Sequence, residues 1–139
     1  MVFLDSDIII STLRKKNTKI NNKAKDVMKN IFQESQPKIT IFNYAELFEG
    51  TFWSPNVAKS QRIMTQYLQK FEIIHFNLKN SLEFARISAE LEMNGNIIGD
   101  MDILIASIVI GNDDVLYTRN IKHFDKISSL KIINWGEDI

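Results

Sequence analysis

Short apolar runs alternate along this chain with stretches whose apolar residues repeat at helical spacing, and this alternation most limits the possible folds. Strand-like runs lie at 2–4, 38–42, 72–76, 115–117 and 130–133. Helical patterns lie between them, at 8–13, 21–35, 44–52, 55–68, 81–93, 102–110 and 120–127. Strands that alternate with helices pair in parallel. The sequence therefore predicts an α/β three-layer sandwich, with a mostly parallel central sheet of four to five strands flanked by helices.

Two of the helical stretches carry more detail. The stretch 8–13 suits a strand as well as a helix, and we predict a helix because Ser6 or Asp7 can cap it. The stretch 102–110 has only Ser107 as a polar residue after the acid at its start, which predicts a helix buried on nearly every side.

The size and composition of the chain narrow the class of protein. Its 139 residues predict a single domain over 1–139. It has no cysteine and two histidines, which excludes disulfide scaffolds, thiolate zinc sites and three-histidine zinc sites. No apolar run reaches the roughly 20 residues of a membrane span, and an acid at position 5 leaves no room for a signal peptide. We therefore expect a cytoplasmic protein that does not enter a membrane.

The charges are balanced in number but not in position. The chain has 17 basic and 17 acidic residues, and seven of the basic ones fall within 14–29 beside one acid, Asp26. Such a run is usually a solvated helix face. The alternative is a basic patch for a polyanion such as nucleic acid.

Polar residues lie at the downstream ends of predicted strands: Asp5 and Asp7 after 2–4, Glu46 after 38–42, and Thr118, Arg119 and Asn120 after 115–117. Two further acids, Asp100 and Asp102, open the apolar helix at 102–110. Because the carboxyl ends of parallel strands share one edge of a sheet, we expect these acids to converge in a cleft. Converging carboxylates need a cation, and oxygen ligands without thiolate or imidazole suit Mg²⁺ or Mn²⁺. Such a site usually performs phosphoryl chemistry.

Each of these residues also has a simpler interpretation. Asp7, Asp100 and Asn120 can be explained as helix caps or first-turn residues without any role in chemistry. Glu46, taken alone, can be explained as an exposed residue of an ordinary helix. Asp102 is different, because a charge at the start of a buried helix is expensive without a partner. His75 and His123 have no partner at ligand spacing, so we take both as structural. Trp53 and Trp135 are expected to pack or to form an interface.

Four motifs follow one another in order over nearly the whole length of the chain. The first is Asp5-Ser6-Asp7 before an apolar run, and the second is Glu46-Leu47-Phe48-Glu49-Gly50. The third is Gly99-Asp100-Met101-Asp102 before an apolar helix, and the last is Thr118-Arg119-Asn120, followed by Phe124, Leu130 and Trp135. Together these motifs resemble those of the PIN-domain ribonucleases, most closely the VapC-type toxins of toxin–antitoxin pairs.

The resemblance implies a metal-dependent hydrolysis of RNA phosphodiesters by an activated water, without a covalent intermediate. It assigns Asp5, Glu46 and Asp102 as metal-binding acids, with Asp100 as an outer-shell carboxylate. Asn120 stands where many relatives carry a fourth acid, and Thr118 is expected to bond to a metal-bound water or to the scissile phosphate. Asp7 stands where many relatives have Asn, and would hold the site through water or add a weak ligand.

The resemblance also implies partners. A VapC-type toxin is usually a homodimer neutralised by a small VapB-type antitoxin, whose tail lies across the active-site groove. The aromatic residues of 44–68 are candidates to line that groove, or are simply core: Tyr44, Phe48, Phe52 and Trp53.

Three other functions remain open at this point. A haloacid-dehalogenase-type phosphatase would use Asp5 as a covalent nucleophile and Thr40 as a phosphate-binding hydroxyl, but it leaves Glu46 without a role. A PIN-like binding module without catalysis is the second. A receiver domain is the third. It would need a phospho-accepting Asp after the third strand, and this chain has none at Phe76-Asn77-Leu78.

Overall fold

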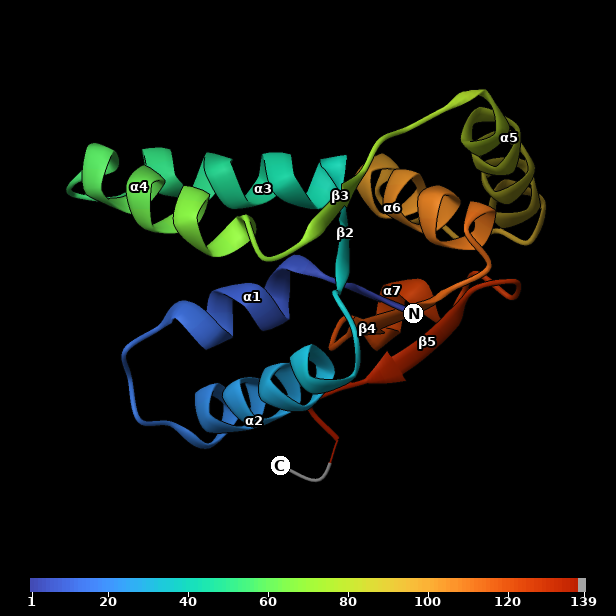
Figure 1. Ribbon diagram of the computed structural model, residues 1–139. Coiled ribbons are helices and arrows are strands. Elements are labelled where there is room, and N and C mark those ends of the chain that lie inside the picture. The colour runs from blue at the N-terminus through green and yellow to red at the C-terminus, as the bar shows by residue number, and fades with distance from the viewer. Residues whose placement is uncertain (138–139) are drawn as a thin grey trace.

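A single parallel sheet forms the centre of the molecule. The computed structural model describes residues 1–137 and places five strands in the order β3-β2-β1-β4-β5, each parallel to its neighbours (Figure 1). The strands are β1 (Val2–Leu4), β2 (Lys38–Thr40), β3 (Glu72–Ile74), β4 (Val115–Thr118) and β5 (Lys131–Asn134). The α/β class and the parallel sheet predicted from the sequence are confirmed.

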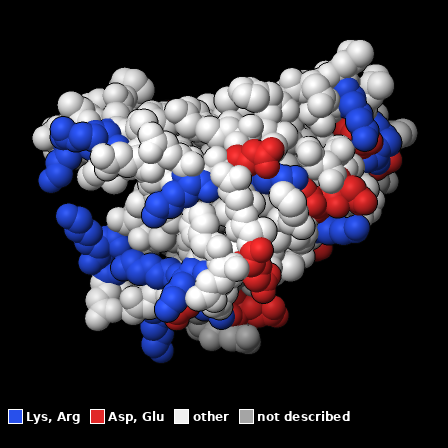
Figure 2. Space-filling view, viewed as in Figure 1, with Lys and Arg blue, Asp and Glu red and all other residues white. Residues whose placement is uncertain are grey.

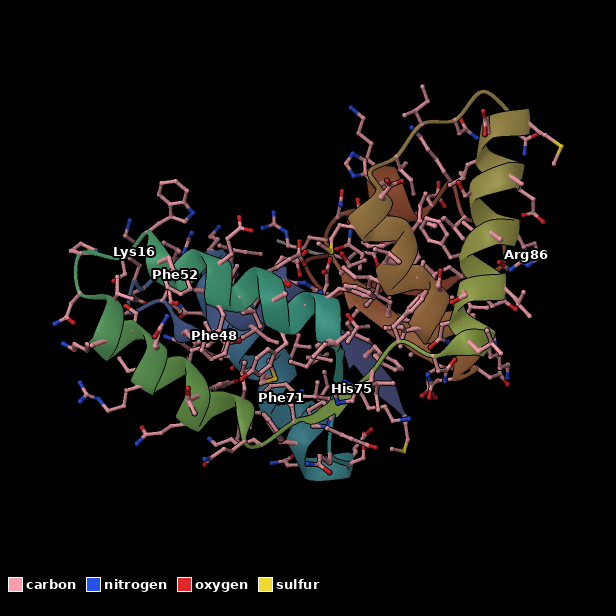
Figure 3. The ribbon with its side chains drawn as sticks, turned by 90° about the horizontal axis from the view of Figure 1, so that it is seen from above. Lys16, Phe48, Phe52, Phe71, His75 and Arg86 are labelled. Atoms are coloured by element: carbon pink, nitrogen blue, oxygen red, sulfur yellow. The ribbon has the colours of Figure 1, made fainter. Side chains whose placement is uncertain are left out.

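Seven helices cover the two faces of this sheet within the described residues. They are α1 (Ser6–Leu13), α2 (Lys19–Glu34), α3 (Ile41–Phe52), α4 (Val57–Leu68), α5 (Leu78–Met93), α6 (Asp100–Gly111) and α7 (Ile121–Phe124). From above, the α3–α4 hairpin and the α5–α6 pair extend to different sides of the sheet (Figure 3). Among residues 1–137, no helix is long and apolar enough to cross a membrane.

Alternation along β1 divides the core into two parts. Phe3 packs on one face, against α5, α6 and α7, and Leu4 packs on the other, against α1 to α4. Both side chains are fully buried, as expected for successive residues of a strand that is covered on both faces. Because β1 is the middle strand of the sheet, the residue that follows it, Asp5, emerges at the centre of the carboxyl edge.

The first helix begins one residue earlier than its predicted caps. Asp5, in an extended conformation, accepts a hydrogen bond from the backbone N–H of Ser6 through Oδ1 at 2.9 Å and is the N-cap of α1. The prediction that Ser6 or Asp7 caps this helix is therefore wrong, because both lie inside its first turn. The cap residue is thus also the first acid of the candidate site.

The second strand is shorter than predicted, because helix α3 begins at Ile41 instead of 44. Thr40 caps this helix by accepting a hydrogen bond from the N–H of Asn43 at 3.1 Å. The apolar residues Ile41 and Phe42 continue the strand pattern in sequence but are helical. The early start places Asn43 in the first turn of α3, one helical turn before Glu46.

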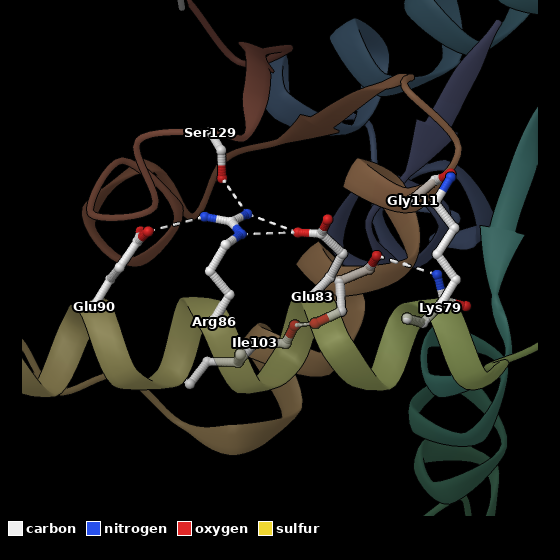
Figure 4. Close-up of polar contacts among 9 residues, drawn as sticks. Lys79, Glu83, Arg86, Glu90, Ile103, Gly111 and Ser129 are labelled. Carbon is white, nitrogen blue, oxygen red and sulfur yellow. Dashed lines mark hydrogen bonds and ion pairs between the residues drawn. The ribbon is translucent and has the colours of Figure 1, made fainter.

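The region around α5 is tied together by charged side chains. Arg86 pairs with Glu83 at 2.7 Å and Glu90 at 3.1 Å on α5, and donates to Ser129 in the loop before β5 at 3.1 Å (Figure 4). Lys79 reaches the carbonyl oxygen of Gly111 at the end of α6 at 3.3 Å. These contacts lie away from the edge that carries the polar motifs, and we assign them to the packing of α5.

Candidate active site

The polar residues predicted from the sequence meet at the carboxyl edge of the sheet. Asp5 follows β1, Glu46 lies on α3 after β2, Asp102 lies in the first turn of α6, and Thr118 ends β4. The parallel order of the strands brings Asp5, Glu46 and Thr118 to this edge, and Asp102 lies close enough for its charge to raise the pKa of Glu46.

Asp5 is the most buried of the acids, at 8% exposed, and both of its carboxylate oxygens are engaged. Oδ1 accepts from the N–H of Ser6 and from Asn43 Nδ2 at 3.0 Å, and Oδ2 accepts from Thr118 Oγ1 at 2.7 Å. Burial, and after it the charges of Asp7 and Glu46, raises the pKa of Asp5 to about 7 against the opposing hydrogen bonds from Thr118 and Ser6. This carboxylate is held in place by neutral donors and destabilised by its surroundings.

Glu46 is linked to Asp5 through two neutral side chains. Its Oε1 accepts from Ser6 Oγ at 3.0 Å, and Asn43 Nδ2 donates both to Ser6 Oγ at 3.0 Å and to Asp5. Burial raises the pKa of Glu46, and so does the negative charge of Asp102. The charge of Asp102 raises the pKa of Glu46, and the charge of Glu46 raises the pKa of Asp5. The three carboxylates therefore lie close enough for each to interact with its neighbour.

Asp102 has a partner that the sequence did not reveal. His123 Nδ1 lies 2.9 Å from Asp102 Oδ2, and because a carboxylate only accepts, a hydrogen bond between them requires the tautomer with its hydrogen on Nδ1. Asn120 Nδ2 lies 3.2 Å from the same ring nitrogen, to which it donates only in the other tautomer, and the backbone N–H of Asn120 donates to Thr118 Oγ1 at 2.9 Å. The interpretation of His123 as purely structural is therefore incomplete, because it contacts a proposed ligand.

Asp7 acts as a clamp between α1 and the end of the sheet. Its Oδ1 accepts from Trp135 Nε1 at 2.9 Å, and its Oδ2 accepts from the backbone N–H of Arg119 at 2.8 Å. Trp135 is 2% exposed, so its predicted packing role is confirmed and a hydrogen bond is added to it. Asp7 thus joins the residues after β1, β4 and β5, and it also supplies the charge that raises the pKa of Asp5.

Asp100 does not lie with the other acids. Two residues apart on a helix are about 200° apart around its axis, so Asp100 and Asp102 project to different sides of α6. Asp100 is exposed and lines a separate cavity of about 240 Å³ with Leu91, Ile98 and Ile103. Its predicted role as an outer-shell carboxylate stays a prediction, and its position gives that role no support.

The donor chemistry of this edge fits a hard divalent cation. Its acids offer only carboxylate oxygens, two of them have raised pKa values, and a cation would relieve both repulsion and burial. Among residues 1–137, however, no three Asp, Glu or His side chains are already arranged to hold a metal ion together. The acids are gathered at one edge and fixed mainly by hydrogen bonds to neutral groups.

A groove opens beside this edge, between α1, α3 and α4. Its volume is about 810 Å³, Glu46 lines it at the active-site side, and Arg14 lines it at the end of α1. Most of the remaining lining is apolar: Ile10, Leu13, Leu47, Gly50, Pro55, Ile63 and Met64, with Thr51, Ser54 and Ser60. None of the four aromatic residues predicted to line a groove does so. Tyr44 and Phe48 pack against the core, while Phe52 and Trp53 are exposed beyond it.

Comparisons with known proteins identify the family. No family model matches the chain. The chain is 33% identical over 134 residues to ribonuclease VapC2 of Rickettsia felis, covering 96% of this chain and 97% of that protein. The solved complex VapBC2 of Rickettsia felis, bound to a DNA fragment of its promoter, matches with a TM-score of 0.81 and 32% identity over 97% of this chain and 99% of that one. VapBC-1 of nontypeable Haemophilus influenzae matches with a TM-score of 0.82 and 27% identity, over 97% and 98% of the two chains.

Fold and site together thus define a PIN-type nuclease scaffold with acids at the carboxyl edge of its sheet. The chain belongs to the VapC family of ribonucleases. This membership does not favour the phosphatase, the receiver domain or the non-catalytic module. The structure adds a reason against the phosphatase, because the hydroxyl of Thr40 is fully buried and donates to Asn43 Oδ1 at 2.7 Å.

Proposed function

We propose that this protein is an endoribonuclease that hydrolyses RNA phosphodiester bonds with the help of Mg²⁺ or Mn²⁺, and acts as a toxin held inactive by a VapB-type antitoxin. The observation that carries the proposal is the meeting of Asp5, Glu46 and Asp102 at one sheet edge, in a chain of the VapC family. We also keep the prediction of a single domain over 1–139, which the single five-stranded sheet supports.

Three acids and their hydrogen-bond donors make up the proposed site. Asp5, Glu46 and Asp102 would hold the cation, which when bound supplies Lewis-acid activation of water and of the scissile phosphate. Thr118 and Asn43 act as positioning residues, because they donate to the two oxygens of Asp5 and fix its orientation. With His123 as donor, the site presents the Asp102 carboxylate in one orientation, as hydrogen-bonded partners of metal ligands commonly do.

Thr118 has a second proposed role in the reaction. Its hydroxyl is fully buried, donates to Asp5 and accepts from the N–H of Asn120, so it connects the strand end to the acids. The role predicted for Thr118, a contact with a water or with the scissile phosphate, remains part of the proposal. Asn120 contributes its backbone N–H to Thr118 Oγ1, and its neutral side chain does not supply the charge of a fourth acid.

The groove supports the predicted antitoxin partner. The relatives from Rickettsia felis and Haemophilus influenzae were solved as VapBC complexes. A mostly apolar groove of about 810 Å³ with Glu46 at one end suits an amphipathic segment whose basic residue reaches the acids. We propose that the antitoxin of this protein binds there, and that the toxin is a homodimer in the cytoplasm.

The decisive experiment is cleavage of total cellular RNA by the purified protein. We expect discrete cuts with Mg²⁺ or Mn²⁺, none with EDTA, and at least about hundredfold slower cutting by Asp102→Asn, since even outer-shell partners of a metal cost 10–100-fold. The matched control is Asp125→Asn, an exposed acid at the end of α7. Metal-dependent cutting that is unchanged in Asp102→Asn would refute the assignment of this residue, and equal cutting in EDTA would refute the metal requirement.

A further inference from the structure

Two segments of this chain carry almost only positive charge. From Ile8 to Gln33 there are seven basic residues and one acid, and from Thr51 to Phe71 there are three basic residues and no acid. Because the whole chain has 17 charges of each sign, the rest of it is strongly acidic. The first segment contains α1, α2 and the loop between them, and the second contains α4.

The folded chain brings these segments to the same end of the molecule. In Figure 2 Lys and Arg side chains gather at the left, above and below a hollow, where Figure 1 places α4 and the α1–α2 loop. Arg14, Lys15 and Lys16 lie in the α1–α2 loop, and Lys59 and Arg62 lie on α4; all five are exposed. Within residues 1–137, none of these five makes an ion pair. Their positive charge is therefore available to a polyanion.

Two aromatic side chains project at this basic end. Phe52 is 67% exposed and Trp53 is 84% exposed, at the end of α3. Tyr44, Phe48 and Phe52 form a stripe at four-residue spacing, and only the last of them leaves the core. Figure 3 shows Phe52 and Lys16 at the same end of the molecule, with Arg86 at the other. Exposed aromatic rings among unpaired cations are the usual means by which proteins bind single-stranded nucleic acid.

The groove connects this surface to the acids. It is lined by Glu46 at one end and by Arg14 at the other. Along α3, Trp53 lies seven residues beyond Glu46, which at 1.5 Å per residue is about 10 Å. A single strand held at the acids can therefore reach the basic end within a few nucleotides.

We propose that the α3–α4 tip and the α1–α2 loop form an anchoring surface for a single-stranded segment of the RNA substrate. Trp53 stacks on a base, with Phe52 beside it. Arg14, Lys15 and Lys16 of the α1–α2 loop and Lys59 and Arg62 of α4 hold the phosphates. This inference rests on the proposed ribonuclease function and adds where the substrate is held outside the acids. It also implies that RNA and an antitoxin in the groove exclude one another.

The test is binding of a short, fluorescein-labelled oligoadenylate in EDTA, so that no cleavage occurs. We expect Trp53→Ala to bind roughly 5- to 150-fold more weakly, the effect of removing one stacked base. Replacing Arg14, Lys15 and Lys16 by Gln should lower the slope of log affinity against log salt by about 2, at about 0.7 per phosphate contact. A matched control replaces three exposed lysines of α5, α7 and β5 regions by Gln: Lys79, Lys126 and Lys131.

Tryptophan fluorescence gives a second measurement on the same samples. The chain has two tryptophans, and Trp135 is 2% exposed, so the emission that RNA can quench by stacking belongs to Trp53. Quenching by oligoadenylate that disappears in Trp53→Leu would support the proposal.

Three results would overturn the inference. One is unchanged RNA binding by Trp53→Ala and by the triple Gln variant, when both still cut cellular RNA at normal rates. Another is an equal loss of salt slope in the control triple. The last is a Trp53→Ala variant that turns a dimer into a monomer with RNA binding intact, which would make the tip an interface between copies. Failure of the wild type to cut or bind any RNA would instead refute the proposed function itself.

Discussion

Replacing Asp5 by Asn should make the metal-free protein more stable at neutral and higher pH while abolishing its activity. Asp5 is 8% exposed and surrounded by neutral donors and two other acids. Asn is nearly the same shape, and its amide oxygen can accept from Ser6 and Asn43 as Oδ1 does. Its amide N–H₂ can donate to Thr118 Oγ1, whose own hydrogen can turn toward Asp7 Oδ2 at 3.4 Å. The variant therefore removes a buried charge without leaving its partners unpaired.

The magnitude follows from the pKa of Asp5, which burial, and after it the charges of Asp7 and Glu46, raises from 3.8 to about 7. Between these two values the unfolded chain has lost the proton and the folded protein has kept it. The free energy of unfolding therefore falls by about 1.4 kcal/mol per pH unit, or about 4 kcal/mol in all. The stabilising contribution of the protonated Asp5 side chain is fully present below about pH 4. It is lost as the pH rises to about 7 and stays lost above it. At pH 8 the variant should be more stable by about this amount, which is on the order of 10–20 °C in Tm.

Urea denaturation in EDTA at pH 5, 6, 7 and 8 measures this effect, with Asp26→Asn on the surface of α2 as the control. The stability of the wild type and of the control should fall with pH relative to the Asp5→Asn variant. At pH 8, Mn²⁺ should raise the stability of the wild type more than that of the variant, since a ligand of the folded state stabilises by mass action. A variant less stable than the wild type at pH 8, or with the same dependence on pH, would refute the argument that Asp5 is destabilised by burial.

Two predictions concern the scaffold. Gly50 lies within α3, and a Cβ added there meets nothing within 4 Å, so Gly50→Ala should raise the free energy of unfolding by about 1 kcal/mol; a loss of stability in urea denaturation would contradict the open space beside it. Lys38 and Asp114 pair at 2.9 Å with side chains 13% exposed, and Asp114→Ala leaves the Lys38 charge without its carboxylate, so it should cost about 3 kcal/mol. Lys38→Met should lower the free energy of unfolding by less, because Asp114 still has the amino terminus at 3.8 Å as a positive partner. Equal losses of stability in the two variants would contradict the assignment of the loss to an unpaired Lys38 charge.

The arrangement of the sheet was predictable because each strand is a short apolar run between helical patterns. The boundaries were less predictable where a side chain bonds to the backbone. Thr40 starts α3 at Ile41 although Ile41 and Phe42 fit a strand, because its hydroxyl binds the N–H of Asn43. Asp5 starts α1 in the same way, ahead of the caps that the sequence favoured. A local hydrogen bond, worth about 1 kcal/mol at a cap, decided both boundaries over the apolar pattern.

The candidate site divides in the same manner. Asp5 and Glu46 could be found from sequence, because parallel strands bring the residues after them to one edge. Asp102 could be found because a charge at the start of a buried helix is expensive without a partner. The groups that hold them could not. Asn43 is an ordinary amide in a helix start, and His123 lies 21 residues from Asp102 with no spacing rule to join them. Only the contact between α6 and α7 brings that pair to 2.9 Å.

The neutral residues around the acids explain why the site can exist before a cation enters it. Burial, and after it the charges of neighbouring acids, raises the pKa values of Asp5 and Glu46, so ionising both carboxylates at this edge is unfavourable. Asn43 Nδ2 donates to Asp5 and Ser6, Ser6 donates to Glu46, and Thr118 donates to Asp5. These hydrogen bonds hold Asp5 and Glu46 in place. Burying the two charges lowers the stability of the metal-free protein, and a bound cation would offset this loss. Because Asn43 Nδ2 donates to both Asp5 and Ser6, replacing Asn43 should disturb the positions of Asp5 and Glu46 even before a cation binds.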